Sequence, residues 1–269
     1  MRIFVSGLRK LVGRPASFVT VGLLAGLLVL IIIASAASAN RSTARGEATL
    51  LLVTFPAAYD FVLEFILGLG GLFAVIYGAA IAGSEWGWGT LKNAVARGES
   101  RTRYMLLTFA SISVMIAVGL ALTFVVGVGA AIVGANIGGV STAGLNDSAT
   151  LTRLPQTFVR GWFSVIEEAS LGFAIATLAR SQLAGIGAGI AFYFGETFAR
   201  FFLPDIVKYM PFAVANASAT AGAPATPGGD GGSTLSSLPA DTALLLVAVW
   251  LIGSLAVAIL FTERAEITG

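Results

Sequence analysis

The chain has 269 residues, of which 57% are hydrophobic and only 11% are charged, and its formal net charge is +2. An average soluble domain carries roughly 25% charged residues, so this composition favours an integral membrane protein whose apolar surface is covered by lipid. The small net charge gives no basis for nucleic-acid binding. Because the sequence holds neither cysteine nor histidine, disulfides, thiol nucleophiles and the usual catalytic base are excluded, and we expect no catalytic residue and no metal site.

The first apolar segment, residues 17–37, follows the basic residues Arg2, Arg9, Lys10 and Arg14. A basic start before an apolar run that ends in small residues is also typical of a cleavable signal peptide. The run is long for a signal sequence, however, and about 20 apolar residues are what a membrane-spanning helix requires. We therefore interpret residues 17–37 as a retained span.

Six apolar segments are each long enough to cross a bilayer as a helix. The predicted spans are residues 17–37, 59–83, 104–133, 158–179, 183–203 and 242–262. The third is longer than a bilayer requires, so its outer end, through Gly134 and Gly138, should project or tilt. Residues 48–55 are apolar but too short to span, and should lie in the outer interface or dip back in before Pro56. The expected fold is one all-α membrane domain, a six-helix polytopic bundle.

The distribution of basic residues predicts the orientation. With the N-terminus inside, ten of the sixteen Lys and Arg residues fall in cytoplasmic segments and both chain ends are cytoplasmic. The longest piece outside the spans, residues 204–241, is then external. Its centre is rich in Ala, Gly, Pro, Ser and Thr, so we expect a flexible outer loop, with one interfacial turn over residues 204–211.

Residues 84–103 join the second and third spans on the cytoplasmic side. Trp86 and Trp88 suit the level of the lipid headgroups, Leu91 and Val95 offer an apolar side, and Lys92 stays in water. These features favour an amphipathic helix on the membrane surface. A solvated loop is the alternative that composition alone leaves open.

This segment resembles the coupling helix of permeases of type-2 ATP-binding-cassette (ABC) exporters. The residues that carry the match are Glu85, Gly89, Thr90, Leu91, Lys92, Arg97, Ser100 and Arg101. Residues 176–187 are similar to the short cytoplasmic turn of that family, and residues 8–15 to its membrane-surface connecting helix. One departure is the run from Ala96 to Glu99, where family members more often have an apolar residue and a proline.

The resemblance implies a permease subunit that exports a small or amphiphilic substrate. In that family the coupling helix docks onto a separate ATPase subunit, which binds ATP and Mg²⁺. The chain has no phosphate-binding loop of the form G-x-x-x-x-G-K-[ST], so it is not itself expected to be an enzyme or to hold a cofactor. The implied partners are that ATPase, a second permease copy or a paralogue, and the lipid of a prokaryotic inner or plasma membrane.

Charged residues inside or near the spans form a second group of candidate functional residues. They are Asp60, Glu64, Arg160, Glu167, Glu168, Glu196 and Arg200. An ionised carboxylate facing lipid is costly, so these groups should face protein or water. In one interpretation Arg160 and Arg200 neutralise the acids and fix a hairpin about Ser181. In the other, the acids line a pathway for cationic or zwitterionic cargo.

Two other classes of function stay open. Intramembrane carboxylates could relay protons in an ion- or proton-coupled secondary transporter, although no inverted repeat or pair of broken helices is evident. An intramembrane enzyme or an assembly factor is the third class. Small residues, including the pair Gly185 and Gly189 and several glycines of the second span, allow close helix packing but do not identify an interface.

Overall fold

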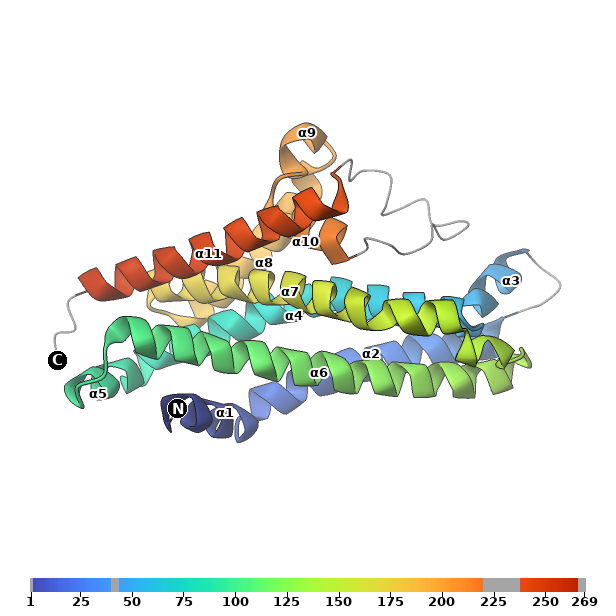
Figure 1. Ribbon diagram of the computed structural model, residues 1–269, viewed down its shortest axis with the longest axis horizontal. Coiled ribbons are helices and arrows are strands. Elements are labelled where there is room, and N and C mark those ends of the chain that lie inside the picture. Colours follow the sequence, from blue (N-terminus) through green and yellow to red (C-terminus); the bar gives the residue numbers. More distant parts are fainter. Residues whose placement is uncertain (1, 40–43, 220–237, 266–269) are drawn as a thin grey trace.

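The computed structural model describes residues 2–39, 44–219 and 238–265, and every regular element within these ranges is a helix. Five of these helices are long and apolar enough to cross a membrane, and they lie side by side along the long axis of the molecule (Figure 1). They are α2 (Pro15–Ser38), α4 (Ala57–Gly87), α6 (Arg101–Gly138), α7 (Ser148–Ala179) and α11 (Ala240–Arg264). The prediction of an all-α protein with several membrane-spanning helices is confirmed.

Helix α8 (Gln182–Ala199) takes the place of the fifth predicted span. Its 18 residues correspond to about 27 Å, slightly less than the roughly 30 Å hydrocarbon core. It is not among the helices that meet the length and hydropathy of a span within the described ranges. The chain then turns through the short helix α9 (Pro204–Val207) into α10 (Pro211–Ala219).

Helix α10 differs from the flexible loop expected over residues 204–241. Seven of its nine residues are buried, because its Ala and Val side chains pack against α7 and α11. The composition of this segment predicted a loop, but its small side chains allow a helix to fit in the narrow space between α7 and α11. Residues 220–237, the rest of the expected loop, lie outside the described residues.

Helices α4 and α7 form the centre of the bundle and approach each other at glycines. A Cβ atom on Gly78 would meet the backbone of Ala169, and one on Gly172 would meet the backbone of Val75. Helix α8 packs on the same pair, since Gly185 faces Ala176 and Gly189 also faces Val75. The glycine pair of α8 therefore serves packing within the chain.

Helix α2 lies at the edge of the bundle against α6 and α4. Its buried residues Leu24, Leu28, Ile32 and Ala36 recur every four positions, so they share one face. Its other faces are apolar too, and Phe18 and Leu30 are exposed. A helix that is apolar all round but buried on one face only is suited to lipid on the others.

The two ends of the bundle carry different elements (Figure 1). One end holds α1 (Arg2–Val12), α5 (Thr90–Ala96) and the last turn of α11. The opposite end holds α3 (Ala44–Leu50), the 3-10 helices η1 (Leu51–Val53) and η2 (Ala143–Asn146), and the start of α7. There Asp147 caps α7, and hydrogen bonds from the Thr150 side chain and backbone lower the pKa of Asp147.

Candidate functional site

Helix α5 is held between α4 and α6 by two glycine turns. Gly89, which begins it, has φ of 64°, and Gly98, which follows it, has φ of 87°, a region that glycine occupies at little cost. Leu91 is buried against the bundle, whereas Lys92 and Arg97 are exposed. The segment therefore forms an amphipathic helix, and the solvated loop is excluded.

Glu85 joins α5 to three other helices. Its carboxylate is 2% exposed and accepts a hydrogen bond from Nζ of Lys10 in α1 at 2.5 Å. The hydroxyls of Thr90 in α5 and Tyr104 in α6 donate to its other oxygen, and a guanidinium nitrogen of Arg14 lies 3.7 Å away. A buried carboxylate is costly unless it is paired and hydrogen-bonded, and here one acid on α4 satisfies both conditions with groups from three separate segments.

Arg101 attaches the end of α11 to the start of α6. Its guanidinium donates to the backbone carbonyls of Thr262, Glu263 and Ala265 at 2.9, 2.9 and 2.8 Å. The last carbonyls of a helix have no partner within the helix, so Arg101 serves as their cap. Thr102 adds two donors to the Glu263 carboxylate, its backbone N–H at 3.0 Å and its hydroxyl at 2.7 Å.

The turn between α7 and α8 reaches the same place. The guanidinium of Arg180 lies 5.1 Å from the ring centre of Trp86 and 5.2 Å from that of Phe261, distances at which cation–π attraction operates. Arg180 itself adopts a left-handed conformation that ends α7. The two segments singled out in the sequence, residues 84–103 and 176–187, are thus in contact.

We call this set of contacts the α5 junction. Its members are Lys10, Glu85, Trp86, Thr90, Arg101, Tyr104, Arg180 and Phe261. It connects α1, α4, α5, α6, the α7–α8 turn and α11.

The structure divides the predicted coupling residues into two groups. Glu85, Thr90, Leu91 and Arg101 make contacts inside the chain, and Ser100 caps α6. Lys92 and Arg97 are exposed on or beside α5 and present positive charge outward.

Sequence reasoning missed two members of the α5 junction, Tyr104 and Phe261. It also missed the ion pair of Lys10 with Glu85. The ion pair had one available signal, because an acid within an apolar run requires a cation from elsewhere. Tyr104 and Phe261 look like ordinary aromatic residues at the ends of spans and carried no such signal.

The acids inside the bundle have three different environments. Glu196 accepts hydrogen bonds from the backbone N–H groups of Phe212 at 3.2 Å and Ala213 at 2.5 Å, so it caps the buried start of α10. Glu168 lies against Gly71, where a Cβ atom would collide with its carboxyl group. Glu167 is fully buried, and neither of its carboxyl oxygens has a hydrogen-bond partner.

The arginines of this region pair elsewhere. Arg160 forms its ion pair with Asp241 at the start of α11, at 3.5 Å, and Arg153 pairs with Asp60 at 2.8 Å. Among the described residues no direct ion pair joins Arg160 or Arg200 to the three buried acids, and the neutralisation and pathway hypotheses both stay predictions. Glu196 is stabilised in another way, because its carboxylate accepts hydrogen bonds from backbone N–H groups of α10. Glu64 is exposed and apart from the group.

These acids do not form a metal centre. Within the ranges that the structure describes, no group of three or more acidic side chains is placed to hold a metal ion. The chemistry open to them is therefore protonation and hydrogen bonding. A fully buried, unpaired carboxyl group such as Glu167 favours the neutral acid, because an isolated charge there is costly.

Comparison with known proteins adds no relative. No protein-family model matches the chain, and no curated protein sequence matches it. The resemblance to type-2 exporter permeases consequently rests on the motifs of residues 8–15, 84–103 and 176–187 and on their order along the chain.

Proposed function

We propose that this chain is the permease subunit of an ATP-driven exporter, with six spans of which α8 is the fifth and α11 the sixth, and with both chain ends in the cytoplasm. The observation that carries the proposal is the α5 junction. Helix α5, which is exposed and basic, contacts α4 and α6, and its Thr90 donates to Glu85, whose carboxylate also accepts from α1 and α6. Beside it, Arg101 joins α6 to α11, and Arg180 joins the α7–α8 turn to α4. Such a connection suits a part that receives mechanical work from another protein.

In this function, α5 docks onto a separate ATPase subunit that binds ATP and Mg²⁺. Lys92 and Arg97 face that partner, while Thr90 and Glu85 pass the movement of α5 to α4, α1 and α6. Arg101 passes it to α11. The substrate is a small or amphiphilic molecule, because the described ranges contain no large domain outside the bundle that could bind a polymer.

A second copy of the chain, or a paralogue, completes the pathway by packing on α8. The outward face of α8 carries Gly187, Ala191 and Gly195 at four-residue spacing, and a Cβ atom on either glycine would meet nothing within 4 Å. Small residues on a lipid-facing helix allow another helix to approach closely. This face is therefore a suitable contact for the partner permease.

One observation favours a second candidate, a proton-coupled secondary transporter. Glu167 is buried without a partner, and intramembrane carboxyl groups of this kind serve as proton relays in transporters. That candidate requires neither an ATPase partner nor an exposed coupling helix. Dependence on the ATPase therefore separates the two functions.

The test reverses the exposed charges of α5. The chain is coexpressed with a phosphate-loop ATPase from the same genome, and copurification and ATP-dependent transport in vesicles are measured. The double variant Lys92→Glu, Arg97→Glu should weaken copurification roughly tenfold, equivalent to about 1.4 kcal/mol, while Lys208→Glu near α9 serves as the matched control. Transport that follows a proton gradient with no ATPase present would reject the exporter and favour the secondary transporter.

A further inference from the structure

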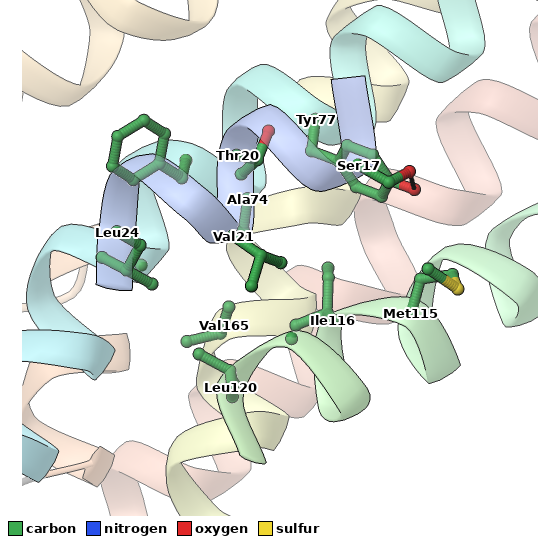
Figure 2. Close-up of a pocket in the computed structure, with 13 residues that line it drawn as sticks. Ser17, Thr20, Val21, Leu24, Ala74, Tyr77, Met115, Ile116, Leu120 and Val165 are labelled. Carbon is green, nitrogen blue, oxygen red and sulfur yellow. Dashed lines mark hydrogen bonds between the residues drawn. The ribbon is translucent and has the colours of Figure 1, made fainter. Parts of the chain in front are cut away.

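A cavity lies between α2, α4, α6 and α7 (Figure 2), and its lining includes no residue of the α5 junction and none of the buried acids. Its volume is about 60 Å³. Val21 from α2 faces Ile116 and Leu120 from α6 across it, and Val165 of α7 closes its floor. Most of its lining is apolar, and three hydroxyl groups, those of Ser17, Thr20 and Tyr77, are the exceptions.

The cavity is open on the side of α2. The lining residues Thr20 and Val21 on α2, Phe73 on α4 and Met115 on α6 are partly exposed. Both α2 and α6 have the length and hydropathy of membrane spans. Their exposed neighbours are large apolar side chains, including Phe18, Leu23, Val118 and Leu122. The surroundings of the opening are therefore the hydrocarbon of the bilayer.

The three hydroxyl groups have no proton left to donate to a ligand. Ser17 donates to the Leu11 carbonyl at 2.8 Å, so the hydrogen bond of 2.8 Å between Tyr77 and Ser17 uses the Tyr77 proton. Thr20 donates to the Ala16 carbonyl at 2.8 Å. With every hydroxyl proton engaged, the cavity offers no donor to a phosphate, a carboxylate or an ester carbonyl. Its occupant is recognised by apolar contact alone.

The size of the cavity excludes most apolar ligands as well. Drug-sized ligands occupy pockets of roughly 300–1,000 Å³, and an apolar cavity that binds benzene has a volume of about 150 Å³. The volume of about 60 Å³ admits the narrow end of a hydrocarbon chain. Water is disfavoured because an apolar cavity of this kind stays dry, whereas a chain end restores the dispersion contacts that an empty space forfeits.

We propose that the end of one acyl chain of a membrane phospholipid occupies this cavity and packs α2 against α4 and α6. Glycines keep the space open: a Cβ atom on Gly119 would meet Val21, and one on Gly70 would meet Leu120 and Leu24. The site binds the tail, and the headgroup stays outside the bundle. The proposal is independent of the transported substrate and of the energy source.

Photocrosslinking tests the proposal on the unmodified chain. The full chain is reconstituted in phosphatidylcholine vesicles that contain a phosphatidylcholine with a diazirine at the end of one acyl chain. After irradiation, mass spectrometry locates the adducts. Val165 and Ala74 are 1% and 3% exposed, so only a chain inside the cavity reaches them, whereas Leu23 and Val118 face the bilayer in any case. Adducts on Val165 or Ala74 support the site, and adducts confined to lipid-facing residues overturn it.

A filled cavity gives the second test. Ala74→Leu places a larger side chain in the cavity, and Gly22→Leu adds the same side chain on the exposed face of α2, where nothing lies within 4 Å. Relative to adducts on Leu23, those on Val165 should fall roughly tenfold in Ala74→Leu, the effect of about two chain methylenes losing their burial. They should be unchanged in Gly22→Leu. Equal Val165 adducts in both variants would show that the chain does not enter between the helices.

Discussion

At the scale of single residues, the buried acids show how differently one apolar bundle can accommodate a carboxyl group. Glu85 is surrounded by a lysine, two hydroxyls and a nearby arginine. Glu196 accepts only backbone N–H groups, and Glu167 accepts none. Each of these three glutamates lies in or beside an apolar run, and the sequence does not tell the three cases apart, because most of the partners lie in other helices.

The contacts of Glu85 predict a large effect on stability. Glu85→Ala leaves Lys10, Thr90 and Tyr104 without their common acceptor. Because these three donors are half-buried and water replaces part of the loss, we expect a destabilisation of about 1–3 kcal/mol in total. Glu85→Gln keeps the shape and should lose less. The measurement is thermal unfolding of the purified chain in nanodiscs. Glu99→Gln, which removes only a surface ion pair with Arg103, is the control and should change stability by less than about 1 kcal/mol.

At the scale of helices, the sequence predicts the long elements well because lipid imposes a simple length rule. The predicted spans 17–37, 59–83, 104–133 and 242–262 lie within α2, α4, α6 and α11. The fourth prediction begins ten residues too late, since α7 starts at Ser148. Its first three turns include Arg153 and Pro155, which interrupt the apolar pattern, yet the pair of Arg153 with Asp60 holds them against α4.

Other features could not be predicted from local sequence. The helix α10 depends on Glu196 to cap it and on α7 and α11 to bury it. The α5 junction likewise requires contacts between segments that are distant in the chain. The composition of residues 84–103 predicted an amphipathic helix. Only the packed structure distinguishes Glu85 and Arg101, which make contacts inside the chain, from the exposed Lys92 and Arg97.

The packing of α4 against α7 predicts that alanine substitutions at two glycines of α4 have opposite effects on stability. Gly78→Ala drives a methyl group into the backbone of Ala169, which cannot rotate away, so the variant should be destabilised by about 1–3 kcal/mol. A Cβ atom at Gly68 meets nothing within 4 Å, and Gly68→Ala should stabilise the helix by roughly 0.5–1 kcal/mol. Thermal unfolding of both variants in nanodiscs provides the comparison. Similar melting temperatures would contradict the close approach of α4 and α7.

At the scale of the whole molecule, the two ends of the bundle are built differently. Helices α1 and α5 and the end of α11 meet at the first, and the contacts of Arg101 and Glu85 fix them together. The short elements α3 and η2 lie at the other (Figure 1). Helices α9 and α10 lie beside the middle of the bundle instead of at that second end. The number of crossings therefore depends on α8.

Labelling of single introduced cysteines tests which side of the membrane each end of the bundle faces, and the chain has no native cysteine to interfere. Asn93 on α5 and Asn146 at the end of η2 are both exposed and lie at opposite ends of the bundle. In intact cells an impermeant maleimide should label Asn146→Cys, and it should label Asn93→Cys only after the membrane is permeabilised. The reverse pattern would overturn the orientation inferred from the basic residues.

Asp205 on α9 then reports on α8 itself. Its side chain is 93% exposed, and its carboxylate pairs with Lys208 at 3.2 Å, so no part of the described chain covers a cysteine at this position. If α8 crosses the membrane, Asp205→Cys should be labelled in intact cells like Asn146→Cys, and α11 returns the chain to the α5 end as the sixth span. Protection of Asp205→Cys in intact cells, with labelling after permeabilisation, would mean that α8 turns back. The end of α11 is held to Arg101, so α11 would then have both ends on the cytoplasmic side and could not be a span.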